Sequence, residues 1–230
     1  MSDESKGIAE NVVRVRQRIA DAARRSGRSA DDVTLVAVTK YVSADVASLL
    51  VEAGCLDFGE SRPQSLWEKA AQLADRPIRW HLIGHLQRNK IHRTLPLVTM
   101  LHSVDSPRLL TAIDEERLPP IPALLEVHIS GEPSKHGFAP EEIEPILATA
   151  AAYGNVSVRG LMGMASLEGG VAAARREFAA LRELRDRLRR NCPPGVTLDE
   201  LSMGMSGDFE VAIEEGATIV RIGSALFEGT

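Results

Sequence analysis

Lys40 is the residue of this chain whose type and position point most directly to chemistry. It ends an apolar run, residues 33–39, that has the length and composition of a buried strand. The chain contains five lysines and twenty-two arginines, so a lysine at this position departs from the general preference of the chain for arginine. Of the two, only a lysine amine can form a Schiff base with a carbonyl compound. The alternative is a strand-end lysine whose stem packs while its ammonium group reaches water.

Two turns near the C-terminal end of the chain have the residue types of a phosphate site. Residues 201–208 combine two glycines with two serines, and residues 223 and 224, Gly-Ser, follow another apolar run. Backbone N–H groups at such turns, and at the N-terminus of a helix that follows, bind phosphate. We therefore expect the helix after Ser206 to direct free N–H groups toward a phosphate. The alternative is that these small residues serve only the turns.

Arg221 stands between Val220 and Ile222 in the last apolar run. Because successive side chains of a strand alternate, Arg221 points into the interior if its neighbours pack outward. An interior guanidinium needs an acceptor, which is either a structural carboxylate such as Glu126 or a ligand heteroatom beside the phosphate. A lysine, phosphate-binding turns and an arginine together suit pyridoxal 5′-phosphate (PLP), which carries an aldehyde, a phosphate and a ring nitrogen.

Strands and helices alternate along the chain in a way that brings these residues to one end of a sheet. The apolar runs that we interpret as strands are 33–39, 56–59, 79–83, 98–104, 123–129, 156–164, 198–203 and 218–222. The expected helices are an amphipathic one over 8–19, then 43–51, 66–73, one opening at 107, 140–152 and 172–190. This alternation predicts an α/β fold, a (β/α)8 TIM barrel in one domain over 1–230, with an open doubly wound sheet as the alternative.

The composition argues against several classes of partner. A net charge of −5 and an aromatic content of 4% give no basis for binding nucleic acid or an anionic membrane. The polar N-terminus lacks the apolar segment of a signal peptide, and no run is long enough to span a bilayer. Cys55 and Cys192 have no motif spacing. We therefore expect a cytoplasmic protein with reduced thiols.

Longer motifs extend the pattern over nearly the whole chain. They are 37–40 (AVTK), 57–60 (DFGE), 80–90 (WHLIGHLQRNK), 102–105 (HSVD), 129–137 (ISGEPSKHG), 160–162 (GLM), 201–206 (LSMGMS) and 220–224 (VRIGS). With these motifs the chain resembles the YggS/PROSC family of pyridoxal-phosphate-binding homeostasis proteins. The resemblance implies a fold-type III barrel like the N-terminal domain of alanine racemases. It implies that Lys40 forms the Schiff base, that Ser206, Gly223 and Ser224 contact the phosphate, and that Arg221 contacts the ring nitrogen.

Some polar residues are given no role in this hypothesis. Ser61 and His128 stand where the family pattern has asparagine, so contacts made by those asparagines are not carried over to this chain. His81 and His85 have i,i+4 spacing, but Gly84 and the strand at 79–83 place them off a helix face, and no third ligand is evident. We expect no metal site.

The resemblance implies PLP homeostasis, in which the protein stores the cofactor and delivers it to apo PLP enzymes, with no catalytic residue assigned. The chain ends at Thr230 without the second domain of alanine racemase, and neither Tyr41 nor Tyr153 has an evident place opposite Lys40. An arginine at the ring nitrogen also weakens the cofactor as an electron sink. The alternatives are a PLP-dependent amino-acid racemase or lyase that uses Lys40 as a base, and a cofactor-free Schiff-base aldolase. We expect a monomer.

Overall fold

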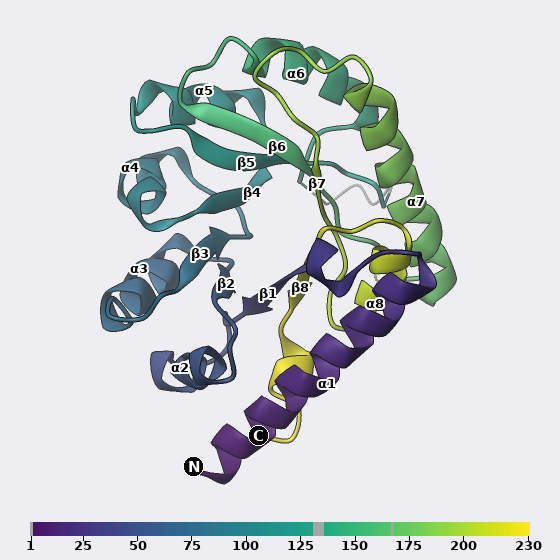
Figure 1. Cartoon of the computed structure of the whole chain (residues 1–230). Helices are drawn as coiled ribbons and strands as arrows, with labels where there is room; N and C mark the ends of the chain where they lie inside the picture. Colours follow the sequence, from purple (N-terminus) through teal and green to yellow (C-terminus); the bar gives the residue numbers. More distant parts are fainter. Residues whose placement is uncertain (1, 131–135, 167) are drawn as a thin grey trace.

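The computed structural model of the chain describes residues 2–130, 136–166 and 168–230. In these ranges eight parallel strands close into a barrel in chain order, with helices around its outside (Figure 1). The strands are β1 (Thr34–Val38), β2 (Asp57–Glu60), β3 (Arg79–Leu82), β4 (Met100–Val104), β5 (Ile121–Glu126), β6 (Val156–Met162), β7 (Glu200–Ser202) and β8 (Ile219–Ile222). The predicted (β/α)8 barrel is confirmed, and the doubly wound alternative is excluded because β1 pairs with both β2 and β8.

The helices lie outside the barrel, and some of them begin where the sequence supplies a capping serine or a first-turn proline. They are α1 (Asp3–Arg25), α2 (Ala44–Glu52), α3 (Pro63–Gln72), α4 (Ile91–Thr94), α5 (Pro107–Glu115), α6 (Ile143–Ala150), α7 (Gly170–Arg189) and α8 (Phe209–Glu214). Ser43 and Ser106 each accept a hydrogen bond from the backbone N–H three residues on, and Pro63 and Pro107 occupy first-turn positions that need no donor. Among the described helices, none is both long and apolar enough to cross a bilayer.

Some element boundaries differ from the prediction for local reasons. The helix expected over 66–73 begins three residues earlier, at Pro63. The helix expected from 140 opens as the 3-10 turn η4 (Pro140–Glu142) before α6. The helix α4 was not predicted, because it is a single turn between η2 (Arg88–Lys90) and η3 (Leu95–Leu97) and is too short to show a period. Residues 131–135 of the motif at 129–137 lie outside the described residues.

The barrel has a large apolar layer outside its strands and a small apolar cluster inside. Between strands and helices lies one continuous core that includes Phe58 and Phe178. The cluster of Val36, Leu124, Met162 and Ile219 is separate from it. These four come from β1, β5, β6 and β8, and they alternate along those strands with residues of the outer core. Polar side chains fill much of the remaining interior, and the candidate site is built from them.

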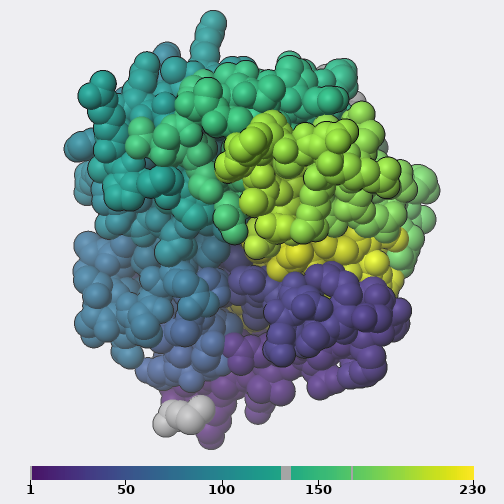
Figure 2. Space-filling view, turned by 45° about the horizontal axis from the view of Figure 1, so that its top comes forward, coloured from purple at the N-terminus to yellow at the C-terminus, as the bar shows by residue number. Residues whose placement is uncertain are grey.

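The helix α1 fastens the C-terminal segment to the barrel. Its apolar face, predicted from the spacing of residues 8, 12, 15 and 19, is buried. Figure 1 and Figure 2 show the N-terminal residues (purple) directly against the C-terminal ones (yellow). Asn11, which is 3% exposed, donates from Nδ2 to the carbonyl oxygens of Leu226 at 3.2 Å and of Glu228 at 3.0 Å. These bonds fix 3-10 turn η5 (Ser224–Leu226), which follows β8.

Replacing Asn11 with alanine is expected to lower the free energy of unfolding by about 1–3 kcal/mol, because two backbone carbonyls lose their amide donor. Denaturant unfolding followed by circular dichroism measures the change. Gln17→Ala, on the exposed face of the same helix, is the matched control and should change stability by less than about 0.5 kcal/mol. Equal effects of the two substitutions would show that Asn11 does not hold the C-terminal segment.

Candidate functional site

The loops after β7 and β8 meet at one hydroxyl group. Ser206 Oγ accepts hydrogen bonds from the backbone N–H groups of Gly223 and Ala225, both at 3.3 Å. Gly204, in the first loop, has a φ of +94°, and a Cβ there would lie 2.6 Å from the Ala212 side chain, so glycine is required. Two backbone N–H groups therefore converge on one hydroxyl at the C-terminal mouth of the barrel, and that hydroxyl oxygen is their acceptor in this structure.

The helix after Ser206 differs from the prediction. The N–H groups of Asp208 and Phe209 both donate to the carbonyl oxygen of Met205, at 3.1 and 2.9 Å, and Met205 N donates to Asp208 Oδ1 at 2.6 Å. The expectation that α8 presents free N–H groups was wrong for these two residues, because the turn itself uses them. The donors around Ser206 come instead from the loop after β8, in which Ser224 is exposed.

Arg221 lies inside the barrel, as strand alternation predicts, and is 4% exposed. Its Nη1 donates to Ser202 Oγ at 2.7 Å and its Nη2 to the carbonyl oxygen of Gly163 at 3.2 Å. Among the described residues its hydrogen-bond partners are these two oxygens, and not Glu126. Burial lowers the pKa of Arg221 to about 10, while the charges of Glu126 and Asp208 oppose this fall. The guanidinium is therefore charged at neutral pH.

Lys40 lies at the same end of the barrel, beside these loops. β1 pairs with β8 so that Val36 stands opposite Arg221, and Val36 faces the interior. Lys40 lies in the turn that follows the C-terminal end of β1. Its side chain is exposed, with Nζ 4.9 Å from the centroid of the Tyr41 ring, which is 89% exposed. In this conformation the ammonium group is in water, and it must leave Tyr41 to enter the barrel mouth.

A buried ion pair holds the residue before Lys40. Lys69 Nζ lies 2.6 Å from Glu60 Oε1 and donates to the carbonyl oxygen of Thr39 at 2.6 Å. Thr39 Oγ1 donates to the same Glu60 oxygen, also at 2.6 Å. The side chains of Lys69 and Glu60 are 10% and 0% exposed. Sequence reasoning missed this cluster, because the lysine lies on a helix with amphipathic spacing, while Glu60 ends β2 and Thr39 follows β1.

Histidines inside the barrel were also missed. His81 Nε2 lies 3.1 Å from Asp57 Oδ1, and His81 Nδ1 lies 2.9 Å from His102 Nε2. His102 Nδ1 lies 2.9 Å from Ser202 Oγ, the hydroxyl that Arg221 also contacts. Side chains alternate between the two faces along β3 and β4. Once the register of these strands is known, alternation places both His81 and His102 on the inward face, so the sequence did contain information about them.

Glu126 and Asp105 are carboxyl groups at the barrel mouth. Burial raises the pKa of Glu126 to about 7, and the charge of Asp105 adds to this effect, while Arg221 and His85 act against it. His85 Nδ1 lies 2.7 Å from Asp105 Oδ2. His81 and His85, which have i,i+4 spacing in the sequence, therefore have different partners. His85 contacts Asp105 at the mouth, and His81 contacts Asp57 and His102 inside the barrel.

His128 and Ser61, the two residues that depart from the family pattern, lie in different structural environments. His128 Nε2 is buried and has no hydrogen-bond partner among the described residues, and the same holds for Ser130 Oγ. Both follow the C-terminal end of β5. Ser61 lies in the bend after β2, and its carbonyl oxygen would be 2.3 Å from a Cβ on Gly84, so this close approach requires the glycine. His128 thus places a buried ring nitrogen near the mouth, whereas Ser61 contributes backbone packing.

Comparison with known proteins identifies the family. The family model described as the alanine racemase N-terminal domain matches residues 9–230. A protein of Pseudomonas aeruginosa named pyridoxal phosphate homeostasis protein is 42% identical over 96% of this chain and 94% of its own length. The chain belongs to the pyridoxal phosphate homeostasis protein family. This outcome agrees with the resemblance found in the sequence motifs.

Solved structures agree with this membership. PipY of Synechococcus elongatus PCC7942, in its structure with PLP bound, superimposes with a TM-score of 0.85 at 32% identity, covering 96% of this chain and 99% of PipY. Alanine racemase from Corynebacterium glutamicum shares the fold, with a TM-score of 0.72 at 18% identity over 96% of this chain and 61% of the racemase chain. The predicted likeness to the alanine racemase barrel is therefore confirmed at the level of the fold.

Replacing Lys69 with alanine is expected to lower the free energy of unfolding by about 3–5 kcal/mol, because it leaves the buried Glu60 carboxylate without its partner. The double substitution Glu60→Gln with Lys69→Met should recover most of that loss, since neither side chain then carries a charge. Urea unfolding of the two variants measures both effects. A loss below about 1 kcal/mol in Lys69→Ala would contradict a structural role for the pair.

Glu126 should make the stability of the cofactor-free protein depend on pH. Its pKa in the folded state, about 7, lies above the ordinary value of 4.5, so the folded state binds more protons between these values. The stabilisation is complete below pH 4.5 and is lost as the pH rises through 7, by about 3 kcal/mol at the full extent of the shift. Glu126→Gln should flatten this part of the profile, as measured by denaturant unfolding at several pH values. An unchanged profile would mean that Glu126 does not titrate in this range.

Proposed function

We propose that the chain is a single barrel domain, residues 1–230, that binds PLP at the C-terminal mouth and serves PLP homeostasis. The observation that carries the proposal is the convergence of Gly223 N and Ala225 N on the Ser206 hydroxyl, directly after the strand that holds Arg221. A phosphate oxygen is the natural acceptor at such a point. The PLP-bound structure of PipY, at 32% identity, supports the same assignment.

The residues at the mouth match the three polar parts of PLP. In this proposal Ser206, Gly223 and Ser224 contact the phosphate. Arg221 uses two of its five N–H groups on Ser202 and Gly163, which leaves donors for a ring nitrogen. When bound, the cofactor supplies an aldehyde that condenses with an amine and releases one water molecule. Lys40 supplies the amine, and its exposed side chain can turn from Tyr41 into the mouth without disturbing the core.

Arg221 favours storage and delivery of the cofactor over turnover. A guanidinium with a pKa of about 10 donates a hydrogen bond to the ring nitrogen and leaves it unprotonated, so the bound ring withdraws electrons poorly. We propose that the protein acts as a cytoplasmic monomer and passes PLP to apo-enzymes that need it. An amino-acid racemase or lyase is the competing function. It is favoured by Glu126, a buried acid at the mouth with a pKa suited to proton transfer near neutral pH.

Borohydride trapping tests the covalent link. After incubation with PLP, reduction and digestion, we expect the cofactor on the peptide that contains Lys40, and we expect Lys40→Ala to remove both the label and the visible absorption. Lys6→Ala, which changes an exposed lysine on α1, is the control and should leave labelling unchanged. Absence of label in the wild-type protein, or label confined to another lysine, would contradict the proposal.

Ser206→Ala tests the phosphate assignment. Loss of one hydrogen bond to a charged phosphate should weaken PLP retention about tenfold, while the protein stays folded. Retention is measured by equilibrium dialysis with absorbance detection. Ser48→Ala, on the outer helix α2, serves as the control. Equal retention in the two variants would remove Ser206 from the phosphate site.

An exchange assay separates a carrier from an enzyme. The holoprotein is mixed with several amino acids in deuterated water, and loss of the α-proton signal is followed by NMR. A PLP carrier is expected to show negligible exchange. Exchange with turnover, abolished by Glu126→Gln, would favour the racemase or lyase alternative.

A further inference from the structure

Six polar side chains form a continuous line across the inside of the barrel, of which the proposed function uses only Arg221. We call this line the relay. Its members are Arg79, Asp57, His81, His102, Ser202 and Arg221, from β3, β2, β3, β4, β7 and β8. Its contacts are Arg79 Nε to Asp57 Oδ1 at 2.7 Å, Asp57 Oδ1 to His81 Nε2 at 3.1 Å, His81 Nδ1 to His102 Nε2 at 2.9 Å, His102 Nδ1 to Ser202 Oγ at 2.9 Å, and Ser202 Oγ to Arg221 Nη1 at 2.7 Å.

The two ends of the relay fix the direction of its hydrogen bonds. An ionised carboxylate only accepts, so His81 Nε2 must carry the hydrogen that reaches Asp57. A neutral His81 then accepts at Nδ1 from His102 Nε2–H. His102 is fully buried, which lowers its pKa well below the ordinary value, and the charge of Arg221 lowers it further. A neutral His102 accepts at Nδ1 from the Ser202 hydroxyl, which itself accepts from Arg221.

The opposite direction leaves a buried donor without a partner. If His81 were doubly protonated, His102 would accept at Nε2 and donate from Nδ1 to Ser202. The Ser202 hydroxyl would then receive two hydrogen bonds, and its own hydrogen would have no acceptor in the relay. Ser202 is 0% exposed, so this arrangement costs about 1–3 kcal/mol. The one-way series with two neutral imidazoles satisfies every member.

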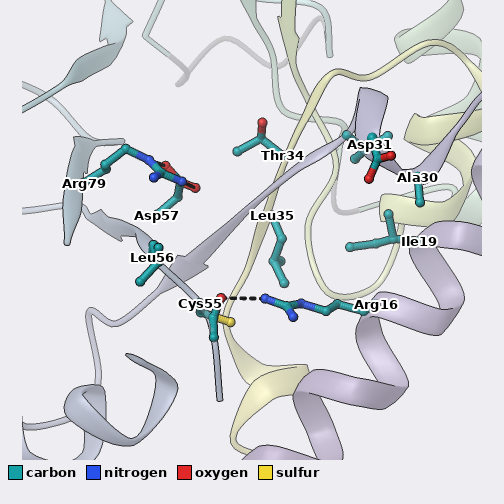
Figure 3. A pocket seen from close by; sticks show the side chains of 12 residues that line it. Arg16, Ile19, Ala30, Asp31, Thr34, Leu35, Cys55, Leu56, Asp57 and Arg79 are labelled. Carbon is teal, nitrogen blue, oxygen red and sulfur yellow. Dashed lines mark hydrogen bonds and ion pairs between the residues drawn. The ribbon is translucent and has the colours of Figure 1, made fainter. Parts of the chain in front are cut away.

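The far end of the relay is held at the opposite end of the barrel. Burial alone raises the pKa of Asp57, but hydrogen bonds from His81 and Arg79, together with the charge of Arg79, outweigh it and lower the pKa. Asp57 and Arg79 lie side by side at the edge of a cavity of about 460 Å³ that Arg16 and Asp31 also line (Figure 3). Because Arg79 balances its charge, Asp57 stays an acceptor without needing a charged His81.

We propose that Ser202, His102 and His81 are positioning residues that hold the Arg221 guanidinium in one orientation for the cofactor's ring nitrogen. They do so by tying it, through the one-way relay, to the Asp57–Arg79 pair at the far end of the barrel. The proposal rests on the proposed function for the ligand that Arg221 meets. The relay itself is a property of the cofactor-free protein and can be tested there.

Long-range ¹H–¹⁵N NMR spectra of the cofactor-free protein test the direction of the relay. At neutral pH, His81 and His102 should both be neutral and carry the hydrogen on Nε2, with Nδ1 as an acceptor. Assignments come from His81→Gln and His102→Gln. A hydrogen on Nδ1 of either ring, or a doubly protonated His81, would overturn the proposal whatever the protein binds.

Cofactor binding tests the positioning role. Ser202→Ala should raise the dissociation constant for PLP about tenfold and shift the ¹⁵N resonance of the labelled ring nitrogen. Asp57→Leu should act in the same direction from the far end, and Asp57→Asn, which keeps an acceptor oxygen, should restore most of the affinity. Asp31→Leu is the control, because it changes a carboxylate of the same cavity that lies outside the relay.

The outcomes separate the two proposals. If the wild-type protein binds PLP and Ser202→Ala and Asp57→Leu match Asp31→Leu in affinity and ring-nitrogen resonance, the relay has no positioning role. If Asp57→Leu does not fold, Ser202→Ala decides alone. If the wild-type protein does not bind PLP, the proposed function fails, and the tautomers of the two histidines still decide whether the relay exists.

Discussion

A charged guanidinium inside a closed barrel is the constraint around which this interior is organised. Arg221 is almost fully buried and remains charged at neutral pH, so it requires acceptors that an apolar barrel core does not supply. Ser202 and the carbonyl of Gly163 provide two. Satisfying Ser202 in turn requires His102, and the series continues to Asp57. The small apolar cluster around Val36 fills only part of the interior, because this polar line takes the rest.

Closure of the barrel brings the beginning and the end of the chain together at one site. β1 and β8 are neighbours only because the sheet closes, and their register places Lys40 beyond Val36 and the Ser206–Gly223–Ala225 convergence beyond Arg221. The helix α1 secures this closure from outside through Asn11. The buried pair of Lys69 and Glu60 fixes Thr39 directly before Lys40. An exposed amine is thus attached to a buried, hydrogen-bonded segment, which suits the role proposed for Lys40 as a reversible link to the cofactor.

The sequence alone was enough to predict the barrel, because eight apolar runs separated by helical segments have few other solutions. Alternation within β8 also predicted that Arg221 points inward. The sequence could not predict which groups Arg221 contacts. Glu126 was the acceptor that the sequence suggested, whereas Ser202 comes within hydrogen-bond distance only because β7 pairs with β8. The role of Lys69 was hidden for the same reason. The expectation of free N–H groups at the start of α8 was wrong for Asp208 and Phe209, because both donate to the carbonyl oxygen of Met205, and such competition is visible only in three dimensions.

The most direct test of the account is a crystal structure of the protein grown with PLP. We expect the phosphate against the N–H groups of Gly223 and Ala225, the ring nitrogen within hydrogen-bond distance of Arg221, and the Lys40 side chain turned from Tyr41 into the barrel mouth and bonded to the cofactor. A phosphate bound elsewhere, or Lys40 still over Tyr41 with PLP present in the barrel, would contradict it.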